Sequence, residues 1–172
     1  MGLDKDSFQF IKGDICDSTT AIRATKGIDV VVHFAAESHV DRSITGPLAF
    51  VQTNVVGTGV LLDSSLKNQV KTFIHVSTDE VYGSSDSGSF LETDPLNPSS
   101  PYSSSKAGSD LLAISYYKTY EMDVRITRAC NNFGPRQYPE KIIPLFITKL
   151  INREKIPLYG NGLNVRDWIH VQ

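Results

Sequence analysis

The clearest chemical pattern in this chain is a tyrosine and a lysine four positions apart, Tyr102 and Lys106. On a helix, residues at this spacing lie on one face. Removing a proton from a tyrosine with a pKa of about 10 costs roughly 4 kcal/mol at pH 7. A cation about 5 Å away returns roughly 3 kcal/mol at an effective dielectric of 20. The spacing therefore predicts a phenol base that takes a proton from a hydroxyl group.

A hydroxyl and two carboxylates follow one another at Thr78, Asp79 and Glu80. Two carboxylates about 4 Å apart repel by roughly 4 kcal/mol at intermediate dielectric, so one of them tends to keep its proton. Such a pair divides naturally into an acid and a base. Taken singly, the Tyr–Lys pair also suits a solvated helix face, and the Thr-Asp-Glu run suits a turn. Their combination predicts oxidation of an alcohol followed by acid–base chemistry beside it.

Alternating strands and helices must position these groups. We expect buried strands at residues 29–34, 71–77 and 124–129, and long helices at residues 47–67 and 102–120. Shorter elements are a strand at 8–11, a helix ending near Gly27, a helix at 142–151 and a strand at 156–159, with loops at 83–101 and 131–139. This order predicts an α/β fold, a doubly wound parallel sheet covered on both faces.

Three clusters of small or polar residues directly follow predicted strands, at residues 35–38, 78–80 and 131–132. Ligands in such sheets bind beyond the carboxyl ends of the strands. Because these ends share one edge of a parallel sheet, we expect the three clusters to form one site.

The composition is that of an ordinary globular domain, with 40% hydrophobic and 21% charged residues and a net charge of −2. Neither a basic patch for nucleic acid nor an apolar run for a membrane is visible. The two cysteines, Cys16 and Cys130, are far apart and predict free thiols in a reducing compartment. The four histidines lack metal-ligand spacing. We expect a cytoplasmic protein without a metal site, a nucleic-acid partner or a membrane partner.

Three longer stretches carry a resemblance to a known family: STDEVYG at 77–83, AAESHVDRS at 35–43 and RDW at 166–168. Together they resemble the nucleotide-sugar 4,6-dehydratases of the extended short-chain dehydrogenase/reductase superfamily, over nearly the whole chain. The resemblance implies a Rossmann-like fold and an NAD-dependent lyase. It would convert dTDP-glucose to dTDP-4-keto-6-deoxyglucose by oxidation of the 4-hydroxyl, loss of water across C5 and C6, and return of the hydride to C6.

The resemblance also implies an internal fragment. No G-x-G-x-x-G turn is present, and Gly57-Thr58-Gly59 lies inside a predicted helix. We therefore expect the first β-α-β unit before Met1 and most of the substrate domain after Gln172. Residues 1–135 would be a partial NAD-binding domain and residues 136–172 the start of the substrate-binding region. By itself this fragment is expected to be inactive.

The resemblance assigns catalytic roles to five residues. Tyr102 would take the 4-hydroxyl proton, and Lys106 would lower the pKa of Tyr102 and bind the nicotinamide ribose. Glu80 would remove the C5 proton, Asp79 would protonate the departing 6-hydroxyl, and Thr78 would hydrogen-bond the 4-oxygen.

The remaining assignments also come from the resemblance. Cofactor contacts, besides Tyr102 and Lys106, would be Asp14, Ile15, Phe34, Ala35, Ala36, Glu37, Ser38, Thr53 and Asn132. Substrate contacts would be Ser38, Thr78, Asn131, Lys141, Ile142, Pro157, Leu158, Tyr159 and Arg166. Some of these residues also suit plain roles: Asp14 a turn, Lys141 a solvated lysine and Tyr159 a core aromatic.

The two long predicted helices are more apolar than a surface helix needs, and the resemblance implies that they pair in a homodimer of the full-length protein. Two alternatives stay open. An NAD-dependent epimerase or decarboxylase of the same superfamily would be favoured if Asp79 and Glu80 pointed away from the substrate. A catalytically silent fragment could instead serve binding or assembly. The choice between dTDP and UDP is not fixed by the sequence.

Overall fold

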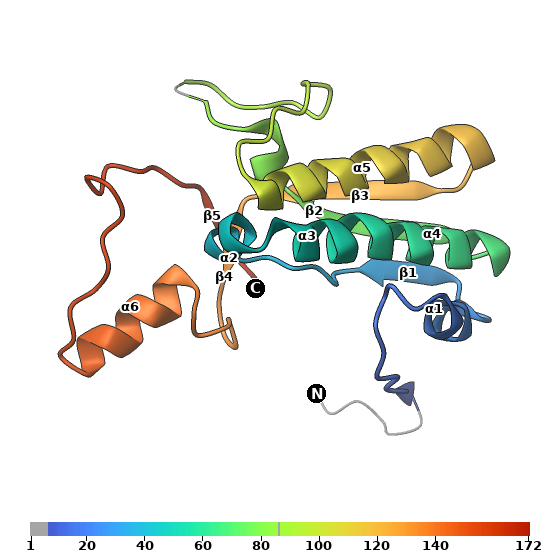
Figure 1. The fold of residues 1–172 in the computed structure, drawn as a ribbon, viewed down its shortest axis with the longest axis horizontal. Helices are drawn as coiled ribbons and strands as arrows, with labels where there is room; N and C mark the ends of the chain where they lie inside the picture. Colours follow the sequence, from blue (N-terminus) through green and yellow to red (C-terminus); the bar gives the residue numbers. More distant parts are fainter. Residues whose placement is uncertain (1–6, 86) are drawn as a thin grey trace. The chain divides into compact units, whose positions relative to one another are not determined.

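The computed structural model describes residues 7–85 and 87–172, and the chain divides into two compact units, Met1–Arg128 and Ala129–Gln172 (Figure 1). None of the described helices has the length and hydrophobicity that a membrane span requires. The expected functional boundary between residues 135 and 136 stays a prediction.

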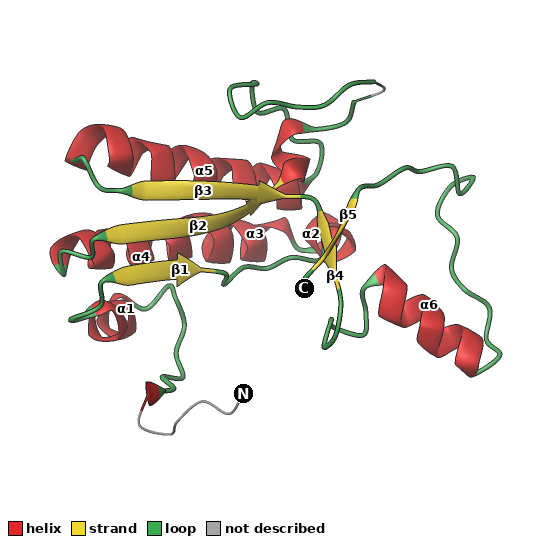
Figure 2. Cartoon of the chain, turned by 180° about the vertical axis from the view of Figure 1, so that it is seen from behind, coloured by secondary structure: helices red, strands yellow, loops and turns green. Residues whose placement is uncertain are grey.

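A three-stranded sheet forms the first unit. Its strands follow the spatial order β1-β2-β3, and their arrows point the same way in Figure 2. β1 pairs with β2 in parallel, with His33 opposite His75. The bounds are Val30–His33 for β1, Thr72–Thr78 for β2 and Val124–Ala129 for β3. This confirms the three central strands and the parallel sheet of the predicted fold class.

Helices connect these strands and cover one face of the sheet. α4 and α5 lie side by side over the strands (Figure 1), and α1 packs against α4. Between β1 and β2 the chain forms α2 (Val40–Thr45), α3 (Pro47–Phe50), the π-helix η2 (Val51–Gly57) and α4 (Thr58–Lys67). The other elements here are α1 (Ser18–Thr25), the 3₁₀-helix η3 (Asp79–Tyr82) and α5 (Pro101–Tyr120). The backbone stays right-handed where α3 joins η2 and where η2 joins α4, so the chain is helical from residue 47 to 67, as expected. The centre of this stretch is a π-helix.

Local sequence explains where the key helices begin. Asp17 caps α1 by accepting a hydrogen bond from the Thr19 N–H at 3.1 Å. Ser100 and Ser103 form a reciprocal capping box at the start of α5, and Pro101 occupies the first turn, where its missing N–H costs nothing. These caps fix the first turn of α5, which carries Tyr102.

The core lies between the sheet and its helices, around Leu62, Phe73, Ala113 and Met122. On the other face of β1, Val30 and Val32 are 46% and 47% exposed. Figure 2 shows the strands in front of α4 and α5 from that side. The expectation that both faces of this strand are buried is therefore wrong within the described residues, where helices cover one face.

The second unit contains a two-stranded parallel sheet and one helix. β4 (Asn131–Phe133) pairs with β5 (Trp168–His170), and α6 spans Ile142–Ile151 as expected. The strands expected at 8–11 and 156–159 do not form. Phe8 and Phe10 are 62% and 76% exposed. A strand needs a neighbouring strand to complete its ladder of hydrogen bonds, and neither run pairs with a strand in the described part of the chain.

Candidate active site

The Thr-Asp-Glu run lies where β2 ends and η3 begins. Thr78 caps η3, because its Oγ1 accepts the Glu80 N–H at 3.3 Å. The same hydroxyl donates to Asp79 Oδ1 at 3.1 Å. Val81 behind them is fully buried and anchors the short helix. Asp79 and Glu80 are thus held at the carboxyl end of a central strand, as the sequence predicts.

Tyr102, the second residue of α5, lies close to Asp79 and Glu80. Burial raises the pKa of Tyr102 to about 12, with Glu80 and Asp79 adding to the effect and a hydrogen bond with Thr78 opposing it. The Phe50 ring packs edge-on against it, with centroids 6.3 Å apart. The expectation that Lys106 lowers the pKa of Tyr102 is not met, because burial and two nearby carboxylates raise it.

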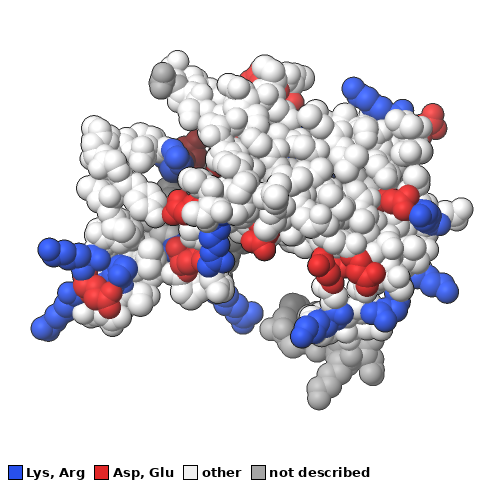
Figure 3. Space-filling view, in the orientation of Figure 1, with Lys and Arg blue, Asp and Glu red and all other residues white. Residues whose placement is uncertain are grey.

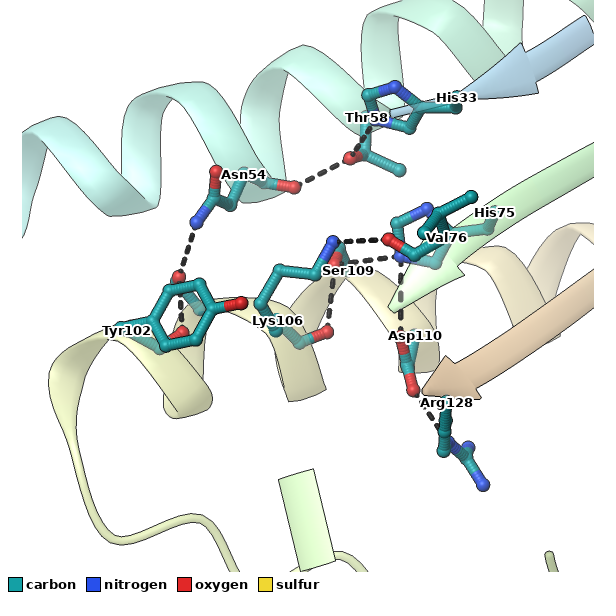
Figure 4. Close-up of polar contacts among 11 residues, drawn as sticks. His33, Asn54, Thr58, His75, Val76, Tyr102, Lys106, Ser109, Asp110 and Arg128 are labelled. Carbon is teal, nitrogen blue, oxygen red and sulfur yellow. Dashed lines mark hydrogen bonds and ion pairs between the residues drawn. The ribbon is translucent and has the colours of Figure 1, made fainter. Parts of the chain in front are cut away.

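Lys106 extends from α5 toward β2 and is only 4% exposed (Figure 4). Its Nζ donates to the Val76 carbonyl oxygen at 2.8 Å. Burial lowers the pKa of Lys106, and the Asp110 carboxylate one turn further along α5 opposes that shift. An ammonium group has three N–H donors. Val76 O is the single hydrogen-bond acceptor of Lys106 among the described residues, so two donors stay available to a ligand.

A buried ion pair lies one turn below Lys106 (Figure 4). Asp110 is fully buried, its Oδ2 accepts from Arg128 Nε at 2.8 Å, and its Oδ1 lies 3.3 Å from His75 Nε2. Burial alone would raise the pKa of Asp110, but the neighbouring side chains of His75, Ser77 and Arg128 hold it below the ordinary value. The sequence did not single out this cluster, because its members come from three separate elements.

His33 of β1 and His75 of β2, which lie opposite each other in the sheet, are both buried and neutral. The Thr58 hydroxyl donates to Asn54 O at 2.6 Å, so His33 Nε2, 2.9 Å from Thr58 Oγ1, must carry the proton and donate. Ser109 likewise donates to the Lys106 carbonyl oxygen, which assigns the proton of His75 to its Nε2. Burial lowers the pKa of His33 to about 3 and also lowers that of His75. Both rings therefore act as hydrogen-bond donors to hydroxyl groups inside the first unit.

Asn54 on the π-helix η2 is a site residue that the sequence analysis missed. It is 1% exposed, and its amide pairs with both peptide groups of Glu37: Oδ1 accepts the N–H at 2.8 Å, and Nδ2 donates to the carbonyl oxygen at 3.0 Å. Nδ2 also donates to Ser105 Oγ at 2.8 Å. Asn54 therefore ties the segment after β1 to α5. Asn54 directly follows Thr53, a predicted cofactor residue that is half-buried in the structure.

The other predicted cofactor residues of the first unit lie in two places. Asp14 forms a turn, with its Oδ1 accepting the Cys16 N–H at 2.9 Å. Ile15 lies against η2, where a Cβ on Gly57 would come within 2.6 Å of Ile15 Cδ1. After β1, the segment 34–38 is held at Glu37, and its members Phe34, Ala35 and Ser38 are exposed, while Ala36 and Glu37 are half-buried.

The predicted substrate residues of the second unit are less constrained. Asn131 donates to the Asp167 carbonyl oxygen at 3.4 Å and Asn132 to the Cys130 carbonyl oxygen at 3.3 Å. The N-cap and first residue of α6 are Lys141 and Ile142, and an exposed loop carries Pro157, Leu158, Tyr159 and Arg166. Tyr159 is 65% exposed, so its alternative reading as a core aromatic is wrong. A shallow pocket of this unit is lined by Phe133, Gly134, Pro135, Arg136, Gln137, Ile143, Pro144, Ile147 and His170, none of them a predicted substrate residue.

Known proteins are similar to this chain in sequence and in fold. A curated dTDP-glucose 4,6-dehydratase from Streptomyces antibioticus is 58% identical over 168 residues, 98% of this chain and 50% of the relative. A crystal structure of a DesIV double mutant, a dTDP-glucose 4,6-dehydratase from Streptomyces venezuelae with NAD bound, has a TM-score of 0.95 at 55% identity, covering 96% of this chain and 52% of that one. A UDP-glucuronic acid 4-epimerase from Bacillus cereus, in complex with UDP-glucuronic acid and NAD, has a TM-score of 0.91 at 31% identity, covering 98% and 53%.

The fold is thus the incomplete Rossmann-like fold of the short-chain dehydrogenases/reductases, as expected. The family model described as GDP-mannose 4,6 dehydratase matches residues 2–172, and the chain belongs to that family. The chain spans about half the length of the curated relatives it matches.

Proposed function

We propose that this chain carries the acid–base centre of a nucleotide-sugar 4,6-dehydratase, an NAD-dependent lyase that converts dTDP-glucose to dTDP-4-keto-6-deoxyglucose. The observation that carries the proposal is electrostatic. The start of α5, which carries Tyr102, packs against η3, which carries Asp79 and Glu80, and both carboxylates act on the pKa of Tyr102. A hydroxyl base and an acid–base pair therefore meet in one place, as oxidation followed by elimination requires.

The residues of this chain suit the nicotinamide end of NAD. Lys106 is buried with two unused N–H donors, which match the paired hydroxyls of a ribose. The exposed small residues after β1, Ala35 and Ser38, allow close approach of a planar ligand. NAD, when bound, supplies the hydride acceptor and donor of the reaction.

The pKa of Tyr102 suggests how the groups cooperate. At a pKa of about 12, ionising this phenol at pH 7 costs roughly 7 kcal/mol, against about 4 kcal/mol for an ordinary tyrosine. A proton on Asp79 removes one of the two negative charges that raise this pKa. Asp79 needs that proton in any case to protonate the departing 6-hydroxyl, while Glu80 takes the C5 proton. The acid form of Asp79 that serves elimination therefore also lowers the cost of ionising Tyr102.

The competing epimerase and decarboxylase readings share the fold, because a 4-epimerase superposes with a TM-score of 0.91. The fold alone therefore does not discriminate among these reactions. The electrostatic coupling of Asp79 and Glu80 to Tyr102 favours the dehydratase, since an epimerisation at C4 needs no acid–base pair for C5 and C6. The silent-fragment hypothesis has less support, because Tyr102 lies near Asp79 and Glu80, the groups proposed to act with it.

The second unit would begin the substrate-binding region. We assign residues 1–135 to cofactor binding and catalysis and 136–172 to the nucleotide diphosphate. The exposed guanidinium of Arg166 offers the planar donor pair that phosphate oxygens prefer. The resemblance also places Lys141 and Tyr159 near the same group. The cytoplasm is the proposed location.

A homodimer is the proposed assembly. Figure 3 shows a broad uncharged face over α3, α4 and α5. Exposed apolar side chains of these helices and of η2 are Leu48, Val51, Leu111 and Tyr117, at 80%, 45%, 59% and 59%. Exposed apolar side chains on neighbouring helices are typical of an interaction site. Sedimentation of the complete protein should give a dimer, and Leu111→Glu should shift it to the monomer.

Activity of the complete protein that carries this chain tests the proposed function. With NAD and dTDP-glucose we expect a 4-keto-6-deoxy product. Asp79→Asn, Glu80→Gln and Tyr102→Phe should each lower kcat by about 10²-fold or more. Glu121→Gln, an exposed acid that ends α5, is the matched control and should keep full activity.

Alternative products separate the competing readings. Turnover of UDP-glucose in place of dTDP-glucose would support the same mechanism with a different nucleotide base in the substrate. A 4-epimer without a 4-keto-6-deoxy product would place the protein among the epimerases. Equal activity of Glu80→Gln and Glu121→Gln would remove Glu80 from the mechanism.

A further inference from the structure

Arg128, at the end of β3, contacts three separate parts of the first unit. Its Nε donates to Asp110 Oδ2 on α5 at 2.8 Å. Its Nη1 donates to the Tyr82 hydroxyl on η3 at 2.6 Å and to the Glu92 carbonyl oxygen in the following loop at 3.3 Å. The side chain is 14% exposed. One guanidinium therefore joins the helix that carries Lys106 to the short helix that carries Asp79 and Glu80.

Tyr82 is the point where this contact reaches the acid–base run. It is the last residue of η3 and is 7% exposed. Its ring stacks on Phe90 with centroids 5.1 Å apart, and the Arg128 guanidinium carbon lies 5.0 Å from the centre of the Tyr82 ring. Beside it, the Asn97 N–H donates to Val81 O at 2.9 Å. The end of η3 is thus held by a side chain and by the loop.

The chemistry of arginine suits this position better than that of lysine. A guanidinium presents five donors in a rigid plane, whereas an ammonium is a single point on a flexible stem. Arg128 uses this geometry to reach a carboxylate and a phenol at once, and it stays charged at any working pH. The buried charge of Asp110 holds it in place.

We infer that Arg128 is a positioning residue that clamps η3 to α5 through Tyr82 and Asp110, and so sets the distance of Asp79 and Glu80 from Tyr102. The inference rests on the proposed function for its catalytic consequence. The clamp itself is a property of the first unit. Elimination requires the carboxylates at the sugar while Tyr102 holds the 4-oxygen, so a loose η3 should slow elimination more than oxidation.

Tyr82→Phe in the complete protein tests the clamp with the least disturbance. It removes the hydroxyl that Arg128 contacts and keeps the ring that stacks on Phe90. Tyr116→Phe is the matched control, because Tyr116 is a partly buried tyrosine of α5 that packs on the core. Loss of one hydrogen bond should speed amide exchange at Gly83 and Asn97 about tenfold in Tyr82→Phe but not in the control. Equal exchange in the two variants would overturn the inference.

Kinetics test its catalytic consequence. We expect kcat of Tyr82→Phe to fall about tenfold with KM within twofold of the wild type. Reduced cofactor, followed by its absorbance, should accumulate during turnover because elimination becomes slower than oxidation. Arg128→Lys should behave in the same way. A lower kcat without reduced cofactor, or unchanged kinetics despite faster exchange, would overturn the positioning role.

The two proposals fail in different ways. A wild-type protein without dehydratase activity would remove the proposed function, while the exchange measurement would still decide whether Arg128 holds η3. Active wild-type protein with a rigid η3 in Tyr82→Phe would remove the clamp alone.

Discussion

Lys106 in the first unit is 4% exposed and donates to a buried carbonyl oxygen, whereas Arg166 in the second unit is exposed and donates to the carbonyl oxygen of its neighbour Val165. Both are cations with a proposed role in binding. The first is fixed before any ligand arrives, because a buried charge must be paired. The second is solvated and free to adapt. The cation proposed to bind the cofactor is thus preorganised, and the cation proposed to bind phosphate is not.

Replacing the buried carboxylate of the first unit should have the largest effect on stability. Asp110→Asn leaves Arg128 without its counter-charge at 2.8 Å, so we expect the free energy of unfolding to fall by about 3–5 kcal/mol. Urea denaturation of the complete protein measures this change. The exposed Asp167→Asn in the second unit should stay within about 0.5 kcal/mol. Similar losses for both variants would contradict the contrast between the units.

Replacing Asn54, whose amide joins the segment after β1 to α5, should have the second-largest effect on stability. Asn54→Ala leaves the N–H and the carbonyl oxygen of Glu37 without their side-chain partner and removes the donor to Ser105 Oγ, at an expected cost of about 2–3 kcal/mol. The same denaturation measurement applies. Asn161→Ala, in an exposed turn, is the control and should change stability little. A neutral Asn54→Ala would show that the segment after β1 is held by other contacts.

His33 should make the first unit sensitive to acid. Its pKa of about 3 in the folded chain lies below the ordinary 6.5, so the unfolded chain takes up the proton first as the pH falls. Its contribution is fully present above pH 6.5 and is lost progressively toward pH 3, by about 2 kcal/mol between pH 7 and pH 5. His33→Gln should lose correspondingly less stability over that interval. His170→Gln, an exposed histidine of the second unit, should follow the wild type; a wild-type slope in His33→Gln would refute the assignment.

Arg166 should show the smallest stability effect and a clear binding effect. Arg166→Ala should change the free energy of unfolding by less than about 0.5 kcal/mol, because the side chain is exposed. Its loss should raise KM for the sugar nucleotide about tenfold if it contacts phosphate. Lys155→Ala in the same exposed segment should leave KM unchanged. Unchanged KM in Arg166→Ala would place the phosphate contact elsewhere.

The central part of the fold was readable from the sequence because its signals are local. The strand expected at 29–34 and the helix expected at 102–120 correspond to β1 and α5. The expected strands at 8–11 and 156–159 were wrong, and β4 and β5 were missed. Strand formation depends on a partner, and residues 131–133 and 168–170 are too far apart in sequence for a local pattern to show their pairing.

The candidate site, like the fold, was only partly predictable from the sequence. Residue types and spacing singled out Thr78, Asp79, Glu80, Tyr102 and Lys106, and the structure brings the acid–base run and the tyrosine together. Spacing alone gave the wrong direction for the pKa of Tyr102. That value depends on burial and on carboxylates from another element, which helix geometry does not contain.

By itself, then, the sequence determined which groups are present and which strand and helix carry them, since caps, hydrophobic runs and i, i+4 spacing act over a few residues. Tertiary structure alone decided what surrounds those groups. The pairing of Asn54 with Glu37, the burial of Asp110 and the reach of Arg128 to Tyr82 join residues from separate elements. Hydrogen bonding and desolvation act through space, so only the folded chain fixes their strength.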